Sequence, residues 1–263
     1  MPTMPLTYSS YLKVDELLQC QKPLSDGPEH DELLFIVIHQ SYELWFKQML
    51  HELDFLVSLF NAGERNRALH TLKRVDAIYR TLIQQVDILE TLTPLEFLSF
   101  RDRLSTASGF QSFQFRELEF LYGAKDPRKL DNYLPGSEHY ARLQKRLKSP
   151  TLWDAFLNFL AKEGHHIPNS LLERDFNLVA EPSPAVQQIL IDIYRNDPLV
   201  SEICEALVDI DTSLQQWRYR HVKMVERTIG SKIGTGGSSG VGYLQTTLFK
   251  AVFPDLWAIR SEF

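Results

Sequence analysis

The sequence predicts an all-α fold, a single-domain helical bundle with long helices as its spine. Apolar residues recur every three or four positions over long stretches, the spacing that places them on one face of an α-helix. No stretch of useful length alternates apolar and polar residues as a strand does. No repeat or composition shift marks a domain boundary, and 263 residues that are 44% hydrophobic suffice to bury a core.

The first long helix is expected to begin at Pro28 and to end before Gly63. Proline suits the first helical position, and Glu29, Asp31 and Glu32 place negative charge in the first turn, where the helix dipole favours it. Glycine suits the residue that terminates a helix. The apolar stripe of this helix consists of Leu34, Ile38, Tyr42, Trp45, Met49, Leu53, Leu56 and Phe60.

The remaining helices follow in order along the chain. A second apolar stripe predicts a helix from about Leu69 to Leu89, and Asp197-Pro198 opens a long helix that reaches about Gly230. The helices that begin near residues 28 and 198 are expected to form the spine of the bundle. Shorter helices are expected from Thr93-Pro94 to about Arg103, between Ser108-Gly109 and Leu121, and over residues 138–147, 151–163, 184–195 and 241–252, with a loop over residues 123–136.

Composition narrows the class of protein. The net charge of −6 gives no basic field, so nucleic acid is not an expected partner. No run of about 18 apolar residues is present, so no membrane-spanning helix is expected. Cys20 and Cys204 lie too far apart in sequence for a local zinc site, and they do not suggest a disulfide framework. With no signal-peptide pattern at the start, these features predict a cytoplasmic protein.

His221 is the most informative residue for function. It lies on the apolar line of the last long helix, between Trp217 and Met224, and the neighbouring cations, Arg218 among them, are expected to point elsewhere. A haem iron needs one imidazole held on a rigid element and surrounded by apolar groups. The flanking cations could meet the propionates of a haem, or they could equally form a solvated face. A core histidine satisfied by one hydrogen bond would produce the same pattern, and it is the more common case from residue type alone.

His39 is the second candidate. On its helix it shares a face with Phe35, Tyr42 and Phe46, and it follows an unbroken apolar run. Two interpretations remain open: a buried structural histidine, or a polar group in an aromatic pocket that forms a hydrogen bond with a ligand.

The glycine-rich stretch over residues 234–240 is the third feature. It lacks the Gly-Lys-Ser/Thr ending of a phosphate loop and follows no strand, so nucleotide binding is poorly supported. It is either a flexible linker or a loop that closes over a site. A di-iron centre is also poorly supported, because only Glu163-Gly-His-His166 fits the Glu-x-x-His motif, which such a bundle needs twice.

Several separated motifs are more specific than these patterns. They occur in order over nearly the whole chain, and together they resemble the tryptophan 2,3-dioxygenase family. The motifs are Tyr8-Ser-Ser-Tyr11-Leu12, His30-Asp-Glu-Leu-Leu-Phe35-Ile-Val-Ile-His39-Gln40, Glu43-Leu-Trp-Phe-Lys47, Phe97-Leu-Ser-Phe-Arg101, Ser108-Gly-Phe-Gln-Ser112, Trp217-Arg-Tyr-Arg-His221 and Gly234-Thr-Gly-Gly-Ser-Ser-Gly240.

The resemblance implies a haem-dependent enzyme of the kynurenine route of tryptophan breakdown. Such an enzyme cleaves the indole C2=C3 bond of L-tryptophan with O2 and forms N-formyl-L-kynurenine. The implied cofactor is haem b, ferrous when active, with His221 as the axial ligand of its iron. His39 resembles the distal histidine, a catalytic residue that accepts a hydrogen bond from the indole N–H. The protein positions the ring, and the haem carries out the difficult step.

The resemblance also implies a substrate pocket. Phe35, Ile36, Val37 and Ile38 would form one wall of it together with His39. Arg101 would pair with the substrate carboxylate, and Phe97 and Ser108 would line the site. Some family members carry Tyr at the position of Phe97, so one hydroxyl contact is absent here. Thr235 and Gly236 would contact the amino-acid head group from the glycine-rich loop.

The N-terminal segment is expected to act outside its own subunit. Residues 1–24 are too apolar for a free tail, and a Pro- and Gly-containing connector separates them from residues 25–263, the expected haem-binding catalytic domain. From the residues alone, docking on the segment's own subunit is the simpler arrangement. The resemblance instead implies a homotetramer in which Tyr8, Tyr11 and Leu12 complete a neighbour's pocket.

Two rival functions remain at this point. A relative of the family could insert one oxygen atom into indole or act on a substituted tryptophan. A non-enzymatic haem sensor is the other rival, but Arg101 and Thr235 argue against it, because a sensor has no need to bind an amino-acid head group.

Overall fold

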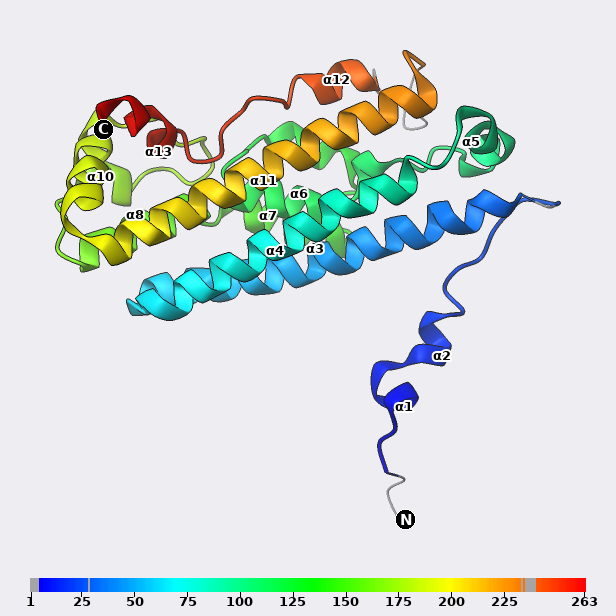
Figure 1. The fold of residues 1–263 in the computed structure, drawn as a ribbon, viewed down its shortest axis with the longest axis horizontal. Coiled ribbons are helices and arrows are strands. Elements are labelled where there is room, and N and C mark those ends of the chain that lie inside the picture. The colour runs from blue at the N-terminus through cyan, green and yellow to red at the C-terminus, as the bar shows by residue number, and fades with distance from the viewer. Residues whose placement is uncertain (1–4, 28, 233, 235–239) are drawn as a thin grey trace.

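The computed structural model describes residues 5–27, 29–232, 234 and 240–263, and this part of the chain contains helices and no strand. Three long helices dominate it: α3 (His30–Ala62), α4 (Arg65–Leu89) and α11 (Pro198–Ile229). They run side by side along the elongated body, with α4 packed against both of the others (Figure 1). The prediction of an all-α bundle with long spine helices is confirmed, and α4 joins the two helices that were expected to form the spine.

Local chemistry explains where the long helices begin and end. Gly63 adopts a left-handed φ of 72°, and its N–H bonds the carbonyl groups of Leu59 and Phe60, which ends α3 as predicted. At its other end α3 begins at His30, with Glu29 as the N-cap, two residues later than expected. Pro28, expected in the first turn, lies outside the described residues.

Three predicted starts combine a capping side chain with a proline in the first turn. Thr93 caps α5 (Pro94–Arg101) through a reciprocal pair of hydrogen bonds with Glu96. Ser183 caps α10 (Pro184–Asn196), and Asp197 caps α11 by accepting a hydrogen bond from the Val200 N–H. These three starts are confirmed.

The shorter helices surround the spine. They are α6 (Phe113–Leu121), α7 (Glu138–Lys148), α8 (Leu152–Lys162), α9 (Asn169–Leu172), α12 (Val241–Gln245) and α13 (Pro254–Ala258), with 3-10 turns at η1 (Asp102–Leu104), η2 (Gly109–Gln111), η3 (Pro127–Asn132) and η4 (Ile259–Glu262). The apolar core runs between α3, α4, α8, α10 and α11, and a smaller cluster joins α6, η3 and α7. None of the described helices is both long enough and apolar enough to cross a bilayer.

Two helix ends differ from expectation. The helix expected to reach Arg103 ends at Arg101 and continues as the 3-10 turn η1. The helix expected over 241–252 ends at Gln245. Phe249 takes a left-handed φ of 59°, which interrupts a helix, and the amides of Val252 and Phe253 bond the Asp211 carboxylate instead of helical carbonyl groups.

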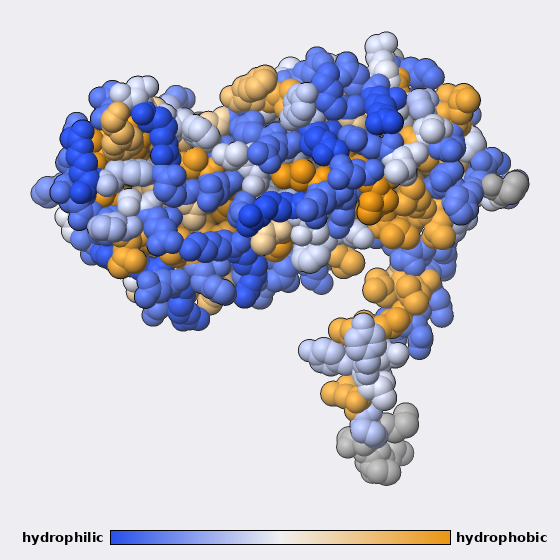
Figure 2. All heavy atoms as spheres, viewed as in Figure 1, coloured by the Kyte–Doolittle hydropathy of each residue, from blue (hydrophilic) through white to orange (hydrophobic). Residues whose placement is uncertain are grey.

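The N-terminal segment projects away from the body (Figure 1). Its two short helices, α1 (Tyr8–Leu12) and α2 (Val14–Leu17), contain no buried residue. Gln40 on α3 bonds Gln21 and the Cys20 carbonyl and so holds the end of the segment. Figure 2 shows hydrophobic residues on the segment and on the part of the body from which it projects.

Candidate active site

A cavity of about 270 Å³ lies between α3 and α11, at the end of the bundle near α5. Residues of α5, α6 and α12 close its other sides. Most of its lining is apolar or aromatic, as in sites that bind flat organic ligands. The aromatic lining comprises Phe35, Tyr42, Phe46, Phe97, Phe110, Phe115, Trp217 and Tyr243.

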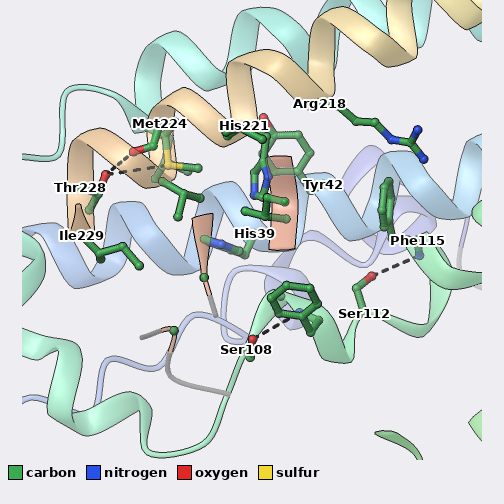
Figure 3. A pocket seen from close by; sticks show the side chains of 18 of the residues that line it. His39, Tyr42, Ser108, Ser112, Phe115, Arg218, His221, Met224, Thr228 and Ile229 are labelled. Atoms are coloured by element: carbon green, nitrogen blue, oxygen red, sulfur yellow. Dashed lines mark hydrogen bonds between the residues drawn. The ribbon is translucent and has the colours of Figure 1, made fainter. Parts of the chain in front are cut away.

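His221 reaches the cavity from α11 (Figure 3). Its ring stacks on the Trp217 indole, with centroids 5.3 Å apart and an interplanar angle of 13°. Burial, and next the nearby His39, lower the pKa of His221 to about 4. The imidazole is therefore neutral at pH 7, and within the described part of the chain no hydrogen bond occupies its nitrogens. A neutral imidazole with an available lone pair is the form that binds iron.

His39 reaches the same cavity from α3, so the two histidines approach each other (Figure 3). Its Nδ1 lies 2.7 Å from the Phe35 carbonyl oxygen. Because a carbonyl can only accept, Nδ1 carries the proton and Nε2 is left as an acceptor. Burial lowers the pKa of His39. Although His39 is classed as exposed, its pKa lies below the ordinary value of 6.5, so the ring is neutral at pH 7.

Phe35 and its neighbours form an aromatic wall beside His39. The ring of Phe35 lies 4.1 Å from that of His39, 5.8 Å from Phe97 and 5.5 Å from Phe100, centroid to centroid. These contacts fix the orientation of Phe35 and of the histidine that packs on it.

Only part of the pocket wall expected over residues 35–39 lines the cavity. Phe35 and His39 line it, whereas Ile38 is buried in the core, Ile36 is half-buried, and Val37 is 41% exposed. Successive residues of a helix point about 100° apart, so a continuous run cannot share one face.

The other expected pocket residues are divided between three places. Phe97, Arg101 and Ser108 line the cavity, and Ser108 is the N-cap of η2 through the Phe110 N–H. Thr235 and Gly236 lie outside the described residues. Tyr8, Tyr11 and Leu12 lie on the projecting segment, 77%, 73% and 46% exposed, and do not contribute to the cavity of their own chain.

Gly234 and Gly240, at the two ends of the glycine-rich stretch, also line the cavity. Gly240 has a φ of +58°, and a Cβ there would sit 2.9 Å from the Lys232 carbonyl oxygen. Glycine is therefore required where Gly240 approaches the backbone of Lys232, just before the stretch.

Sequence reasoning missed a polar side of the cavity. Arg218 was expected to face away, yet it is 9% exposed and lines the cavity, as do Arg116 and Glu119 of α6. Residues three apart lie on one side of a helix, so the spacing of Arg218 and His221 contained this signal. Arg220 and Lys223 do point elsewhere and pair with acidic groups outside the cavity.

Comparison with known proteins gives a consistent result over the whole chain. The family model described as tryptophan 2,3-dioxygenase matches residues 3–162 and 154–263. Proteins named tryptophan 2,3-dioxygenase from Herpetosiphon aurantiacus, Anaeromyxobacter sp. strain K and Caulobacter vibrioides are 57%, 54% and 46% identical to this chain. The alignments cover 98%, 97% and 98% of the chain and 98%, 96% and 98% of the three relatives.

Proposed function

The chain belongs to the tryptophan 2,3-dioxygenase family, and we propose that the cavity between α3 and α11 is its active site. The enzyme is an oxidoreductase that cleaves the indole C2=C3 bond of L-tryptophan with O2 to give N-formyl-L-kynurenine. One observation carries the assignment of the site: two neutral histidines approach each other across an aromatic-lined cavity. We keep the cytoplasm as the proposed compartment, in line with two free cysteines.

The donor set of the cavity fits a haem. Within the described residues no cluster of three or more His, Cys, Asp or Glu could bind a bare metal ion. The cavity offers ring nitrogens from two histidines, His39 and His221, too few for a bare ion, which suits a group that brings its other ligands within its own ring. We therefore assign haem b as cofactor and His221 as its axial ligand. When bound, ferrous haem supplies the binding and activation of dioxygen.

His39 receives the indole N–H. Its Nε2 is an acceptor because the Phe35 carbonyl holds the proton on Nδ1, and the lowered pKa keeps the ring unprotonated. An N–H donor and this acceptor orient the indole by one neutral hydrogen bond. The indole N–H can stay protonated throughout, so His39 need not act as a base.

The aromatic wall positions the ring and excludes water. Phe35 and Phe97 line the cavity, and both pack against Phe100, which is fully buried. Packing of the indole against them fixes its angle at little entropic cost, because these rings are already held. A dry cavity also protects the reacting atoms from solvent.

Arg101 binds the substrate carboxylate in this proposal. A planar guanidinium can bond both oxygens of a carboxylate at once, and Arg101 lines the cavity at the C-terminal end of α5. Thr235 and Gly236 complete the head-group site from the glycine-rich stretch, whose two ends reach the cavity at Gly234 and Gly240.

We further propose a homotetramer in which Tyr8, Tyr11 and Leu12 complete the pocket of a neighbouring subunit. Two features support this. The segment is apolar yet exposed, and it projects from its own body (Figures 1 and 2). Apolar side chains of this kind are stabilised by a surface that covers them. Light scattering should give a tetramer, and mixing a Tyr8/Tyr11 variant with an Arg101 variant should restore some intact pockets. A monomer with full activity would end this part of the proposal.

The activity itself is tested by mixing the anaerobic ferrous protein with tryptophan and then oxygen. Absorbance of N-formylkynurenine should rise, and the product mass should exceed that of tryptophan by 32, since two oxygen atoms are added. A gain of 16 would identify a mono-oxygenase. Haem binding with no product would identify a sensor.

A further inference from the structure

The cavity holds two arginines that the proposed function does not use. Arg116 projects from α6 and Arg218 from α11, and both line the cavity although they are only 6% and 9% exposed. Figure 3 shows Arg218 on the side of α11 that faces Phe115. Arginine is among the residues least often buried, and when it is buried it is normally paired. We refer to Arg116 and Arg218 as the arginine pair.

One carboxylate serves both members of the arginine pair. Arg116 Nη1 donates to Glu119 Oε2, whereas Arg218 Nη2 lies 3.6 Å from Glu119 Oε1, beyond hydrogen-bond length. Arg218 Nη1 makes one long bond of 3.4 Å to the Thr247 carbonyl. Arg116 Nε is buried with no hydrogen-bond partner in the described residues. Two guanidinium groups thus have more donors than Glu119 can satisfy.

Other charges near the pair do not remove this excess. Lys129 is a third cation close to Arg116, and its Nζ donates to the Tyr243 hydroxyl. Glu43 lines the cavity, but its carboxylate accepts a hydrogen bond from the Gln114 amide. Arg116, Arg218 and Lys129 outnumber Glu119 and Glu43, the two carboxylates that line the cavity, and Asp126, which also lies near Lys129, is paired with Arg128. A buried excess of cation is unfavourable unless an anion joins it.

We propose that the arginine pair binds a carboxylate on the rim of the haem, which rests on the function proposed above. Guanidinium groups match carboxylates in geometry and charge. Arg218 lies one turn from His221 on the same helix, so its position is fixed relative to the ring that would hold the haem. Arg101 reaches the cavity from a different helix, α5, and is the residue that the proposed function assigns to the substrate. With one haem carboxylate added to Glu119, the charge of the arginine pair is balanced.

The test compares haemin with its dimethyl ester, in which both carboxylates are blocked. Each is titrated into the full-length protein prepared without haem, and binding is followed by Soret absorbance. The wild type should prefer the free acid by about tenfold or more, the value of a hydrogen bond to a charged group. Arg218→Met should reduce this preference by about tenfold, and Arg218→Lys should restore part of it. Arg220→Met, on the same helix but paired outside the cavity, should leave it unchanged.

Glu119→Gln should change the preference for the free acid in the opposite direction. It removes the carboxylate that competes for the arginine pair, so the preference for the free acid should rise. If the arginine pair has only a structural role, the ratio of the affinity for haemin to that for its dimethyl ester should not change. If Arg218→Met fails to fold by circular dichroism, Glu119→Gln alone decides, and an unchanged or lower ratio overturns the inference.

Three further outcomes distinguish a substrate carboxylate from a haem carboxylate, and a failure of the inference from a failure of the proposed function. Tryptophan and indole binding are compared in the same variants, because they differ in the amino-acid head group. If Arg218→Met lowers tryptophan binding relative to indole and spares the haemin preference, the pair binds the substrate and the inference is wrong. If haemin binds normally to Arg218→Met with its full preference over the ester, the inference alone fails. If neither compound binds the wild type, the proposed function fails instead.

Discussion

The two halves of α11 have the same apolar spacing and different surroundings. In the first half, Ile203, Leu207 and Ile210 are buried at 1% exposure or less in the core shared with α4 and α10. In the second half, His221 and Met224 continue the stripe but border the cavity. Helical periodicity therefore identifies the inward face of α11, and it does not distinguish packed core from binding site.

The polar groups in the two halves of α11 also differ, in whether other protein groups satisfy their hydrogen bonds. Asp211, in the packed half, is fully buried and accepts bonds from the amides of Val252 and Phe253, the indole of Trp257 and the amide of Gln215. Arg218 and His221, in the second half, retain bonding capacity that the described protein groups do not use. Satisfied buried groups stabilise a fold, whereas unsatisfied ones identify a place for a ligand.

The largest effect expected in the cavity half is that of His221→Ala. If His221 is the axial ligand, its removal should abolish haem binding, since loss of even an outer partner of a metal ligand costs roughly 10–100-fold in affinity. Absorbance of the purified variant measures this, and added imidazole should restore part of the spectrum. A haem spectrum identical to that of the wild type would refute the assignment of His221.

In the packed half of α11, a substitution should lower the stability of the fold instead of haem binding. Asp211→Ala leaves the amides of Val252 and Phe253 and the indole N–H of Trp257 without this acceptor. A buried donor without a partner costs roughly 1–3 kcal/mol, so we expect the free energy of unfolding to fall by roughly 3–5 kcal/mol. Denaturant unfolding measures the change. Asp209→Ala, two residues earlier and exposed, is the matched control and should stay within about 0.5 kcal/mol of wild type. Equal losses in both variants would contradict the contrast between the two halves.

Arg101→Ala extends the comparison to α5. If Arg101 bonds the substrate carboxylate, the variant should weaken tryptophan binding by roughly 2–5 kcal/mol and leave haem in place. Optical titration of the haem protein with tryptophan measures this affinity. Arg103→Ala, an exposed arginine in the following 3-10 turn, is the control. Tryptophan affinity within a factor of about three of wild type would rule out the role of Arg101.

The sequence predicted the parts of the fold that depend on local chemistry. Thr93, Ser183 and Asp197, each followed by proline, open helices as expected, because capping requires only neighbouring residues. The helix expected over 241–252 begins as predicted, but its end was wrong, because Asp211, some 40 positions away, binds the amides of Val252 and Phe253. A tertiary contact of this kind leaves no local pattern.

The histidine and aromatic residues of the candidate site could be predicted from the sequence, but its charged residues were harder to predict. His39 and His221 interrupt apolar stripes, which is visible in sequence. The direction of Arg218 depends on Glu119 from another helix and on the Thr247 carbonyl, and the sequence does not state that these meet. The positions of Tyr8 and Tyr11 in an assembly require a second chain and stay a prediction.

The smallest effect expected in the cavity is that of His39→Ala. One neutral hydrogen bond to the indole N–H is worth about 1 kcal/mol net, and roughly 1–3 kcal/mol if the N–H is left buried without an acceptor. Tryptophan affinity and turnover should fall together by that amount. Turnover abolished with unchanged affinity would instead mean that His39 acts as a base.

The pH dependence of tryptophan affinity provides a second test of the role of His39. Burial holds the pKa of His39 below its ordinary value of 6.5, so Nε2 is an acceptor at pH 7 and remains one somewhat below pH 6.5. Protonation of His39 would place its N–H against the indole N–H and weaken tryptophan binding. Tryptophan affinity should therefore stay level from pH 8 to 6.5 and decline only as the pH falls further. His39→Ala should lose this decline. If the variant keeps the same acidic decline as wild type, another group titrates, and the acceptor role of His39 is not the cause.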